Sequence, residues 1–493
     1  MRDTIFYASK DEKITPQEIA HADLARKLAG ECMVLLENDG VLPLKSRGEI
    51  ALYGNGVRKT IQGGTGSGSV NTRSITNIEK GFEEAGFTVT NKAWLDANDE
   101  HYKKMQEAYQ EWLEEEGKRR NVPPFLVSFD YPFSEPAPYT ISKEEVAGCK
   151  AKIAVYVISR NSGEGKDREY REGDYLFYPE ELDGIRNLIA GGKKLIVVLN
   201  IGGVMQLTEL KKIIGINAIV LMNQLGNLGG NALVDLISGA VTPSGKLADT
   251  WAVEYKDYPS SATFSHNNGN VDEEYYQEGI YVGYRYFDSF GVTPLYPFGY
   301  GLSYTSFDIK TVKVEQKSEF IVVSVKVRNT GDYYTGKEVV QIYLSKPQGQ
   351  MDMPYQELVA FQKTGELRPG EEECIDLEFP LELLAGYDTD SAAYLVEAGD
   401  YIVRVGADSA STQAAVLTVK SRTMLKQCEN MAFADEKQEE IKSVRKAVKE
   451  EALWKIQLDL SKITPITVSY TREHAQLVNT VKDQITMRDV LDG

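Results

Sequence analysis

Up to about residue 250, short apolar runs alternate with longer stretches in which apolar residues recur every three or four positions. Short apolar runs bounded by glycine are typical of buried strands, whereas the longer spacing is typical of amphipathic helices. Their alternation predicts a mostly parallel sheet with helices on both faces. Strands are expected over 49–56, 153–159, 195–200 and 218–222, and helices over 15–40, 76–85, 179–188, 229–238 and from residue 142 onward.

The first predicted helix, over 15–40, has start and stop signals. Thr15 and Glu18 have the spacing of a capping box, and Pro16 occupies the first helical position. Gly40 is a natural stop at the other end. One apolar face is expected, formed by residues that recur every four positions: Leu24, Leu28, Cys32 and Leu36.

Beyond about residue 300 the apolar period changes to two. This alternation, with turn signals at 369–370 and 398–400, predicts a small antiparallel sandwich over about 305–420. The alternating apolar positions are Val323, Val325, Val327, Ile375, Leu377, Phe379, Tyr401, Val403 and Val405.

These patterns divide the chain into four parts. We expect an α/β domain over 1–255, a connecting segment over 256–304, the antiparallel sandwich over 305–420 and a C-terminal arm over 421–493. Because the arm mixes apolar residues with many charges, we interpret it as a linker or docking arm. The fold class is therefore α/β: a mostly parallel α/β sandwich, then an antiparallel β-sandwich, then the arm.

The charge and the apolar runs narrow the class of partner. The formal net charge is −18, and phosphate binding needs basic clusters, so no nucleic-acid partner is expected. The longest apolar runs, 153–158 and 195–199, are too short to cross a bilayer, and the polar first residues do not resemble a signal peptide. We therefore expect no membrane partner and a cytoplasmic location.

The four cysteines, Cys32, Cys149, Cys374 and Cys428, are far apart and include no CxxC pair. A thiolate zinc site and a disulfide framework are therefore disfavoured, and buried free thiols are expected.

In open α/β sheets, ligands bind beyond the carboxyl ends of the strands. The glycine-rich segment 63–68 follows the first predicted strand at such an end. It lacks the Lys-Ser/Thr of a phosphate-binding P-loop, and no helix opens at its last glycine as a dinucleotide site needs. Its glycines let backbone approach a ligand closely, and Ser67 offers a hydroxyl. A purely structural loop remains the alternative.

A second polar loop, 160–174, follows the strand predicted at 153–159. Within it, Glu164 lies between Gly163 and Gly165. Glycoside hydrolysis usually needs two carboxyl groups, one of them protonated at the leaving oxygen. A carboxyl on such a loop suits that role if the loop reaches a cleft built elsewhere, and a solvated loop glutamate is the alternative.

At these two loops the chain resembles glycoside hydrolase family 3, in particular its α/β-sandwich domain followed by its fibronectin type III-like domain. Each matching stretch alone is modest, but together they stand in the family's order at sensible spacings and cover most of 15–420. The stretches are 34–44, 63–68, 159–168, 243–247, 278–287 and 297–304.

The resemblance implies roles for individual residues. In family members with a matching loop, the glutamate that corresponds to Glu164 is the general acid/base. Ser67 matches a residue that contacts the sugar, and Thr65 beside it is assigned to substrate binding as well. Asp167 and Arg168 are assigned as positioning residues. No metal and no organic cofactor is implied.

The chain departs from the family's pattern in one decisive respect and in one smaller one. Family members attack the sugar with an aspartate from a (β/α)8 barrel, in a Ser-Asp-Trp type motif, and no such motif occurs here. In a permuted subgroup the barrel follows the fibronectin-like domain, and the segment 484–493 resembles the lead-in to such a barrel. The nucleophile is therefore expected from a separate barrel polypeptide, and it stays open whether that barrel is an independent chain, a processed half or a deleted part. A second departure is 69–70, where some relatives carry an aspartate, so aglycone preference stays open.

The resulting prediction is part of a retaining exo-β-glycosidase, most similar to a β-glucosidase, acting on small β-glucosides or oligosaccharides. The partner is the barrel polypeptide, and a homo-oligomer is left open. The alternatives are a non-catalytic carbohydrate-binding or assembly subunit and another family 3 activity. The latter include β-xylosidase, and also phosphorylase or N-acetylglucosaminidase, whose acid/base is often a barrel histidine.

Overall fold

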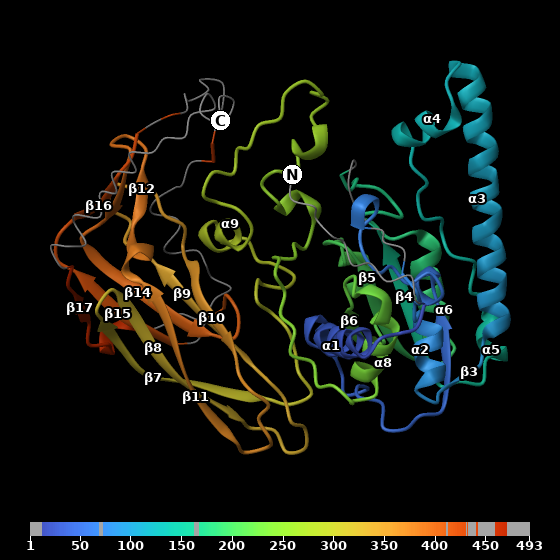
Figure 1. The fold of residues 1–493 in the computed structure, drawn as a ribbon, viewed down its shortest axis with the longest axis horizontal. Coiled ribbons are helices and arrows are strands. Elements are labelled where there is room, and N and C mark those ends of the chain that lie inside the picture. Colours follow the sequence, from blue (N-terminus) through green and yellow to red (C-terminus); the bar gives the residue numbers. More distant parts are fainter. Residues whose placement is uncertain are drawn as a thin grey trace. The chain divides into compact units, whose positions relative to one another are not determined.

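The structure, a computed structural model, describes residues 12–68, 72–161, 167–410, 413–429, 431, 440–441 and 459–470. The chain divides into two compact units (Figure 1). The first comprises Met1–Gly203 and Glu209–Gly245, and the second comprises Val204–Thr208 and Lys246–Gly493.

The first unit is built on a six-stranded sheet in the order β1-β6-β5-β4-β2-β3. All neighbouring strands are parallel except β1, which pairs antiparallel with β6 at one edge. The mostly parallel α/β fold expected from the sequence is confirmed. The strands are β1 (Val34–Asn38), β2 (Glu49–Tyr53), β3 (Thr88–Val89), β4 (Ile153–Arg160), β5 (Lys194–Ile201) and β6 (Ile216–Leu221).

The two central strands, β4 and β5, form the core of this unit. Residues 154–158 and 195–199 are all at most 1% exposed, because both faces of the sheet are covered. The helices are α1 (Pro16–Cys32), α2 (Ile78–Glu84), α3 (Lys92–Arg120), α4 (Pro124–Asp130), α5 (Lys143–Gly148), α6 (Pro179–Ala190), α7 (Thr208–Lys211, at the division between the units) and α8 (Gly229–Ile237).

The prediction of one helix over 15–40 is wrong in its second half. The capping box at Thr15 is present, but α1 ends at Cys32 and the chain continues as strand β1. The predicted apolar face is also wrong, since Leu24 and Leu28 are 53% and 51% exposed. The helix instead packs through its small residues Ala29 and Gly30, which are buried. Hydrogen bonding to β6 at the edge of the sheet explains why the apolar run after Cys32 is a strand.

Helix α3 is not among the elements predicted from the sequence. It is labelled in Figure 1 and has 29 residues, most of them polar and exposed. Its buried residues are Trp94, Leu95, Asn98, Tyr102, Leu113 and Gly117. Trp94 packs edge-on against Tyr53 of β2, and their ring centroids are 4.9 Å apart. The return segment after α4 runs back along this helix, where His101 contacts the carbonyl of Ala137.

The second unit contains the antiparallel strands expected for a fibronectin type III-like fold, with a shared apolar core. Its sheets have the orders β10-β9-β14-β15-β17, β11-β8-β7 and β12-β13-β16. The strands are β7 (Phe307–Lys317), β8 (Phe320–Asn329), β9 (Val339–Ser345), β10 (Glu357–Lys363), β11 (Glu372–Pro380), β12 (Gly386–Asp388), β13 (Ala393–Val396), β14 (Gly399–Gly406), β15 (Gln413–Val419), β16 (Thr423–Gln427) and β17 (Ile466–Val468).

Two further segments belong to this unit. Residues 246–304, which include helix α9 (Tyr284–Ser289), contact the strands. The Leu358 N–H of β10 donates to the Tyr284 hydroxyl at 2.7 Å. Strands β16 and β17 lie beyond residue 420, and β17 pairs parallel with β15. Most of the predicted arm lies outside the described residues.

The expectation that the cysteine thiols are buried is wrong. Cys32 and Cys374 are exposed, and Cys149 and Cys428 are partly exposed. In the described part of the chain, no helix combines the length and the apolar character needed to cross a membrane.

Candidate functional site

The two loops singled out in the sequence leave the same edge of the first unit's sheet. Strands β2 and β4 are parallel neighbours, so their carboxyl ends lie side by side. The glycine-rich segment 63–68 follows β2, and the loop that begins at Asn161 follows β4. Strands β5 and β6 continue the parallel order beyond β4 and add their own loops to this edge.

The turn directly after β2 requires glycine. Gly54 has φ +93°, and a Cβ placed on it would lie 2.1 Å from the carbonyl oxygen of Val157 in β4. The chain then forms the short 3-10 helix Asn55–Val57, in which Gly56 lies against Val157 and Ser159 of β4. The glycine-rich segment follows this helix in the sequence.

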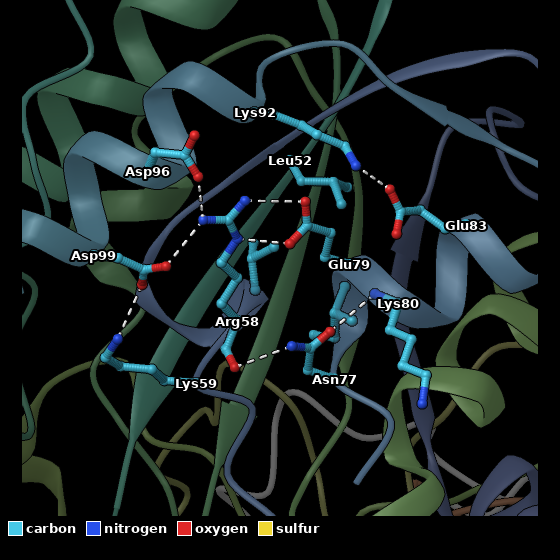
Figure 2. A network of polar contacts seen from close by, with 12 residues as sticks. Leu52, Arg58, Lys59, Asn77, Glu79, Lys80, Glu83, Lys92, Asp96 and Asp99 are labelled. Atoms are coloured by element: carbon cyan, nitrogen blue, oxygen red, sulfur yellow. Dashed lines mark hydrogen bonds and ion pairs between the residues drawn. The ribbon is translucent and has the colours of Figure 1, made fainter.

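Arg58, just after this turn, is held by three carboxylates (Figure 2). It forms a two-pronged contact with Glu79 of α2, at 2.6 and 3.2 Å, and contacts Asp96 and Asp99 of α3 at 2.7 and 3.0 Å. Hydrogen bonding to Glu79 raises the pKa of Arg58, and burial only partly opposes this. The stem of the glycine-rich loop is therefore fixed to both helices by charge-assisted hydrogen bonds.

Asn200, near the end of β5, holds the same stem from the other side. Its amide is fully buried, accepts the Ile61 N–H at 2.7 Å and donates to the Ile61 carbonyl at 3.0 Å. The amide also donates to the carbonyl of Asn223, after β6, at 2.7 Å. One side chain thus joins the loops that follow β2 and β6. It supplies hydrogen bonds to backbone groups of Ile61 and Asn223, which a neighbouring strand would supply inside a sheet.

The loops after β4 and β6 are also connected. Gln224 donates to the side chain of Asn161 at 3.2 Å, and the Gly226 N–H donates to the Gln62 carbonyl at 2.9 Å. Asn161 is the first residue after β4, so hydrogen bonds connect the loops that follow β2, β4 and β6.

The glycine-rich loop ends in a short 3-10 helix, Gly66–Gly68. Thr65 is exposed immediately before it, and Gly66 has φ +77°. The Ser67 backbone is part of this helix, whereas its side chain lies outside the described part. The two predicted substrate-binding positions are therefore adjacent on a loop at the carboxyl edge, and their contact with a sugar stays a prediction.

Glu164, the predicted acid/base, lies in 162–166, outside the described residues. The two predicted positioning residues follow it. Asp167 is exposed, whereas the guanidinium of Arg168 is largely buried and contacts Asp174 at 2.7 Å. Arg168 is thus in a position to fix the backbone that follows Glu164.

The residue that ends β4, Arg160, is buried at the other end of the same segment. Its guanidinium contacts both carboxylate oxygens of Glu181, at 2.9 and 2.6 Å, and donates to the carbonyl of Asp174 at 3.0 Å. Burial lowers the pKa of Arg160, but the charge and hydrogen bonds of Glu181 outweigh it and the net shift is upward. Arg160 is therefore a fixed cation at the base of the loop.

Five residues that shape this edge were not predicted from the sequence: Arg160, Asp174, Glu181, Asn200 and Gln224. A weak signal existed for two of them, since Arg160 and Asn200 are polar residues at the ends of apolar strands. In the described ranges, no group of three or more His, Cys, Asp or Glu side chains is arranged to hold a metal ion. The loops at this edge supply the hydroxyl of Thr65, the amide of Gln224 and the guanidinium of Arg168.

Comparison with known proteins defines the class. Residues 33–284 match the glycosyl hydrolase family 3 C-terminal domain, and residues 338–409 match the fibronectin type III-like domain. The chain therefore belongs to glycosyl hydrolase family 3, as its motifs predicted.

Individual relatives agree with this assignment. Beta-glucosidase A of Butyrivibrio fibrisolvens is 34% identical over 82% of this chain and 51% of its own length. A beta-glucosidase of Ruminococcus albus is 32% identical over 83% of this chain and 42% of its own length. The structure of beta-glucosidase 3B from Thermotoga neapolitana in complex with α-D-glucose superposes with a TM-score of 0.72 at 37% identity, covering 83% of this chain and 55% of that one. The chain thus spans about half the length of the relatives that it matches.

Proposed function

We propose that this chain supplies the general acid/base, Glu164, of a retaining exo-β-glycosidase of the β-glucosidase type, and that the nucleophilic aspartate comes from a (β/α)8 barrel polypeptide. The carrying observation is that the loops with Ser67 and Glu164 leave adjacent parallel strands at one edge of the sheet. Membership of family 3 supports the reaction class.

The proposed reaction has two steps. The barrel aspartate attacks the anomeric carbon while the bond to the leaving oxygen breaks, and Glu164 gives its proton to that oxygen. Glu164, now a carboxylate, then takes a proton from water as the water oxygen attacks the anomeric carbon and releases the aspartate. The two carboxyl groups of such a pair stand about 5–5.5 Å apart, so the barrel must bring its aspartate to the carboxyl edge.

The proposed substrates are terminal, non-reducing β-linked sugars with a small or oligosaccharide aglycone. The relatives named as beta-glucosidases and the glucose in the Thermotoga structure support glucose as the first sugar to test. Thr65 and Ser67 would offer hydroxyl groups to that sugar, and Asp167 and Arg168 would hold the acid/base segment. The cytoplasmic location and a homo-oligomer stay predictions.

The test is reconstitution from separate polypeptides. Residues 1–493 and a family 3 barrel polypeptide from the same source are purified apart and assayed with nitrophenyl β-glucoside, alone and mixed. We expect turnover only in the mixture, together with co-elution of the two chains. Full turnover by residues 1–493 alone, or an inactive mixture whose chains elute separately, contradicts the proposal. A mixture with Glu164→Ala serves as the matched control for background hydrolysis.

A further inference from the structure

Both ends of the segment that carries Glu164 meet at a single residue, Asp174. The Asp174 carbonyl accepts from Arg160 at 3.0 Å, before the segment, and from Arg168 at 2.7 Å, after it. The Asp174 carboxylate accepts from Arg168 at 2.7 Å and from the Glu169 N–H at 2.7 Å. The residues on each side of 161–167 are therefore tied together by one backbone carbonyl and one carboxylate.

Asp174 itself stands on a turn with little freedom. Its N–H donates to the Arg171 carbonyl at 3.3 Å, and the Gly173 N–H donates to the Leu176 carbonyl at 3.0 Å. Gly173 has φ +78°, and a Cβ there would lie 2.0 Å from the ring of Tyr178. Only glycine fits this turn, so the position of Asp174 is set by close packing as well as by hydrogen bonds.

The turn that carries Asp174 is also connected to the start of helix α6. Glu181 pairs with Arg160 and also accepts the Tyr178 N–H at 2.9 Å. The Tyr178 hydroxyl donates to the carbonyl of Glu135 at 2.7 Å, on the segment that returns along α3. We call the contacts of Asp174 with Arg160, Arg168 and Glu169 the clamp. The clamp is therefore connected to the start of α6 and to the return segment that carries Glu135.

We propose that Asp174 is a positioning residue for the acid/base: by tying Arg168 and Glu169 to the end of β4, it sets where the Glu164 segment begins and ends. This inference rests on the proposed function. A loop acid must reach the leaving oxygen within hydrogen-bond range, and a misplacement of about 1 Å can cost roughly 10²-fold in rate. The carboxylate of Asp174 is largely buried beside Arg168, and its negative charge strengthens the hydrogen bond that it accepts from the Arg168 guanidinium.

The experiment uses the enzyme with its barrel polypeptide present and the variant Asp174→Asn. We expect kcat/KM on aryl β-glucosides with poor leaving groups, which reports the first step, to fall by about 10- to 10²-fold. The loss of kcat/KM on an activated dinitrophenyl glucoside should be much smaller, because that leaving group needs no proton. An equal loss on all leaving groups would indicate a structural role only and would overturn the proposal.

Three comparisons keep the outcome clear. Asp183→Asn removes a carboxylate from an exposed pair with Arg186 and should leave every rate unchanged. Arg168→Lys keeps the charge but cannot make both contacts to Asp174, so it should reproduce the dependence on leaving group even if Asp174→Asn folds poorly. If Glu164→Ala shows the leaving-group dependence and neither clamp variant does, this inference fails alone; if Glu164→Ala lacks it too, the proposed function fails.

Discussion

Glu181 holds the guanidinium of Arg160 through both of its carboxylate oxygens, and the two side chains are only 5% and 3% exposed. The pair joins the end of β4 to the start of α6. A buried pair of this kind adds little net stability relative to an apolar pair, but it is costly to break on one side only. Arg160 and Glu181 therefore define the geometry at the base of the loop that begins at Asn161 more than they add free energy of folding.

The first prediction concerns this pair. Arg160→Met leaves a buried, uncompensated carboxylate and should lower the free energy of unfolding by about 3–5 kcal/mol. The measurement is denaturant unfolding followed by the fluorescence of Trp94, which is buried in the same unit.

The matched control is Arg186→Met, whose partner Asp183 is 69% exposed, and it should change the free energy by at most about 1 kcal/mol. The double variant Arg160→Met/Glu181→Leu should be more stable than Arg160→Met alone, since no charge is left unpaired. A double variant that is less stable than the single one would contradict this view of the pair.

The second prediction concerns Glu135 and pH. Burial raises the pKa of Glu135, and the Tyr102 hydroxyl only partly opposes this. Its Oε2 atom is buried with no hydrogen-bond partner among the described residues. As the pH rises above the ordinary value of about 4.3, the unfolded chain loses this proton before the folded chain does, so the folded state loses stability.

Glu135→Gln should therefore increase the free energy of unfolding at pH 7 relative to the unmodified chain, and the gain should shrink toward pH 4. Each unit by which the pKa is raised contributes about 1.4 kcal/mol at pH values above both pKa values. Urea unfolding at the two pH values measures the difference, with the exposed Glu111→Gln as control. A gain of the same size at pH 4 and pH 7 would count against the buried carboxyl as its source.

The third prediction concerns Ser67. If its hydroxyl contacts the sugar, Ser67→Ala should lower kcat/KM of the assembled enzyme by the equivalent of about 0.5–1.5 kcal/mol, with little change in melting temperature. Ser46→Ala, at an exposed position before β2, is the control. A large loss of melting temperature with normal kinetics would instead support a purely structural loop.

Much of the first unit's fold could be predicted from the sequence because its strands are buried on both faces. Strands β4 and β5 are continuous apolar runs, and a run of this kind is visible without knowing its neighbours. Helix α3 could not be found in this way, since its polar residues far outnumber the buried ones such as Trp94 and Tyr102. The end of α1 was misplaced because Met33 to Leu36 fits either a helical face or an edge strand, and only pairing with β6 decides between them.

The candidate site was predictable only where a motif carries it. Thr65, Ser67, Asp167 and Arg168 were located by resemblance, and the structure places their loops at one edge of the sheet. Asn200 acts through a contact with Ile61, which is distant in sequence. Asp174 acts through contacts with Arg160 and Arg168, which it reaches because the chain turns back on itself. Such contacts depend on the order of strands, which apolar periodicity does not define.

The central claim, that Glu164 is the acid/base, is tested most directly by azide rescue of Glu164→Ala in the enzyme assembled with its barrel polypeptide. On aryl β-glucosides with poor leaving groups, we predict a loss of about 10²- to 10⁴-fold, because the leaving oxygen lacks its proton donor. On an activated dinitrophenyl glucoside, added azide should restore turnover and yield the β-glucosyl azide, since azide attacks the glycosyl-enzyme without a base. Undiminished hydrolysis of the poor substrates, or turnover that azide does not change, would contradict the assignment.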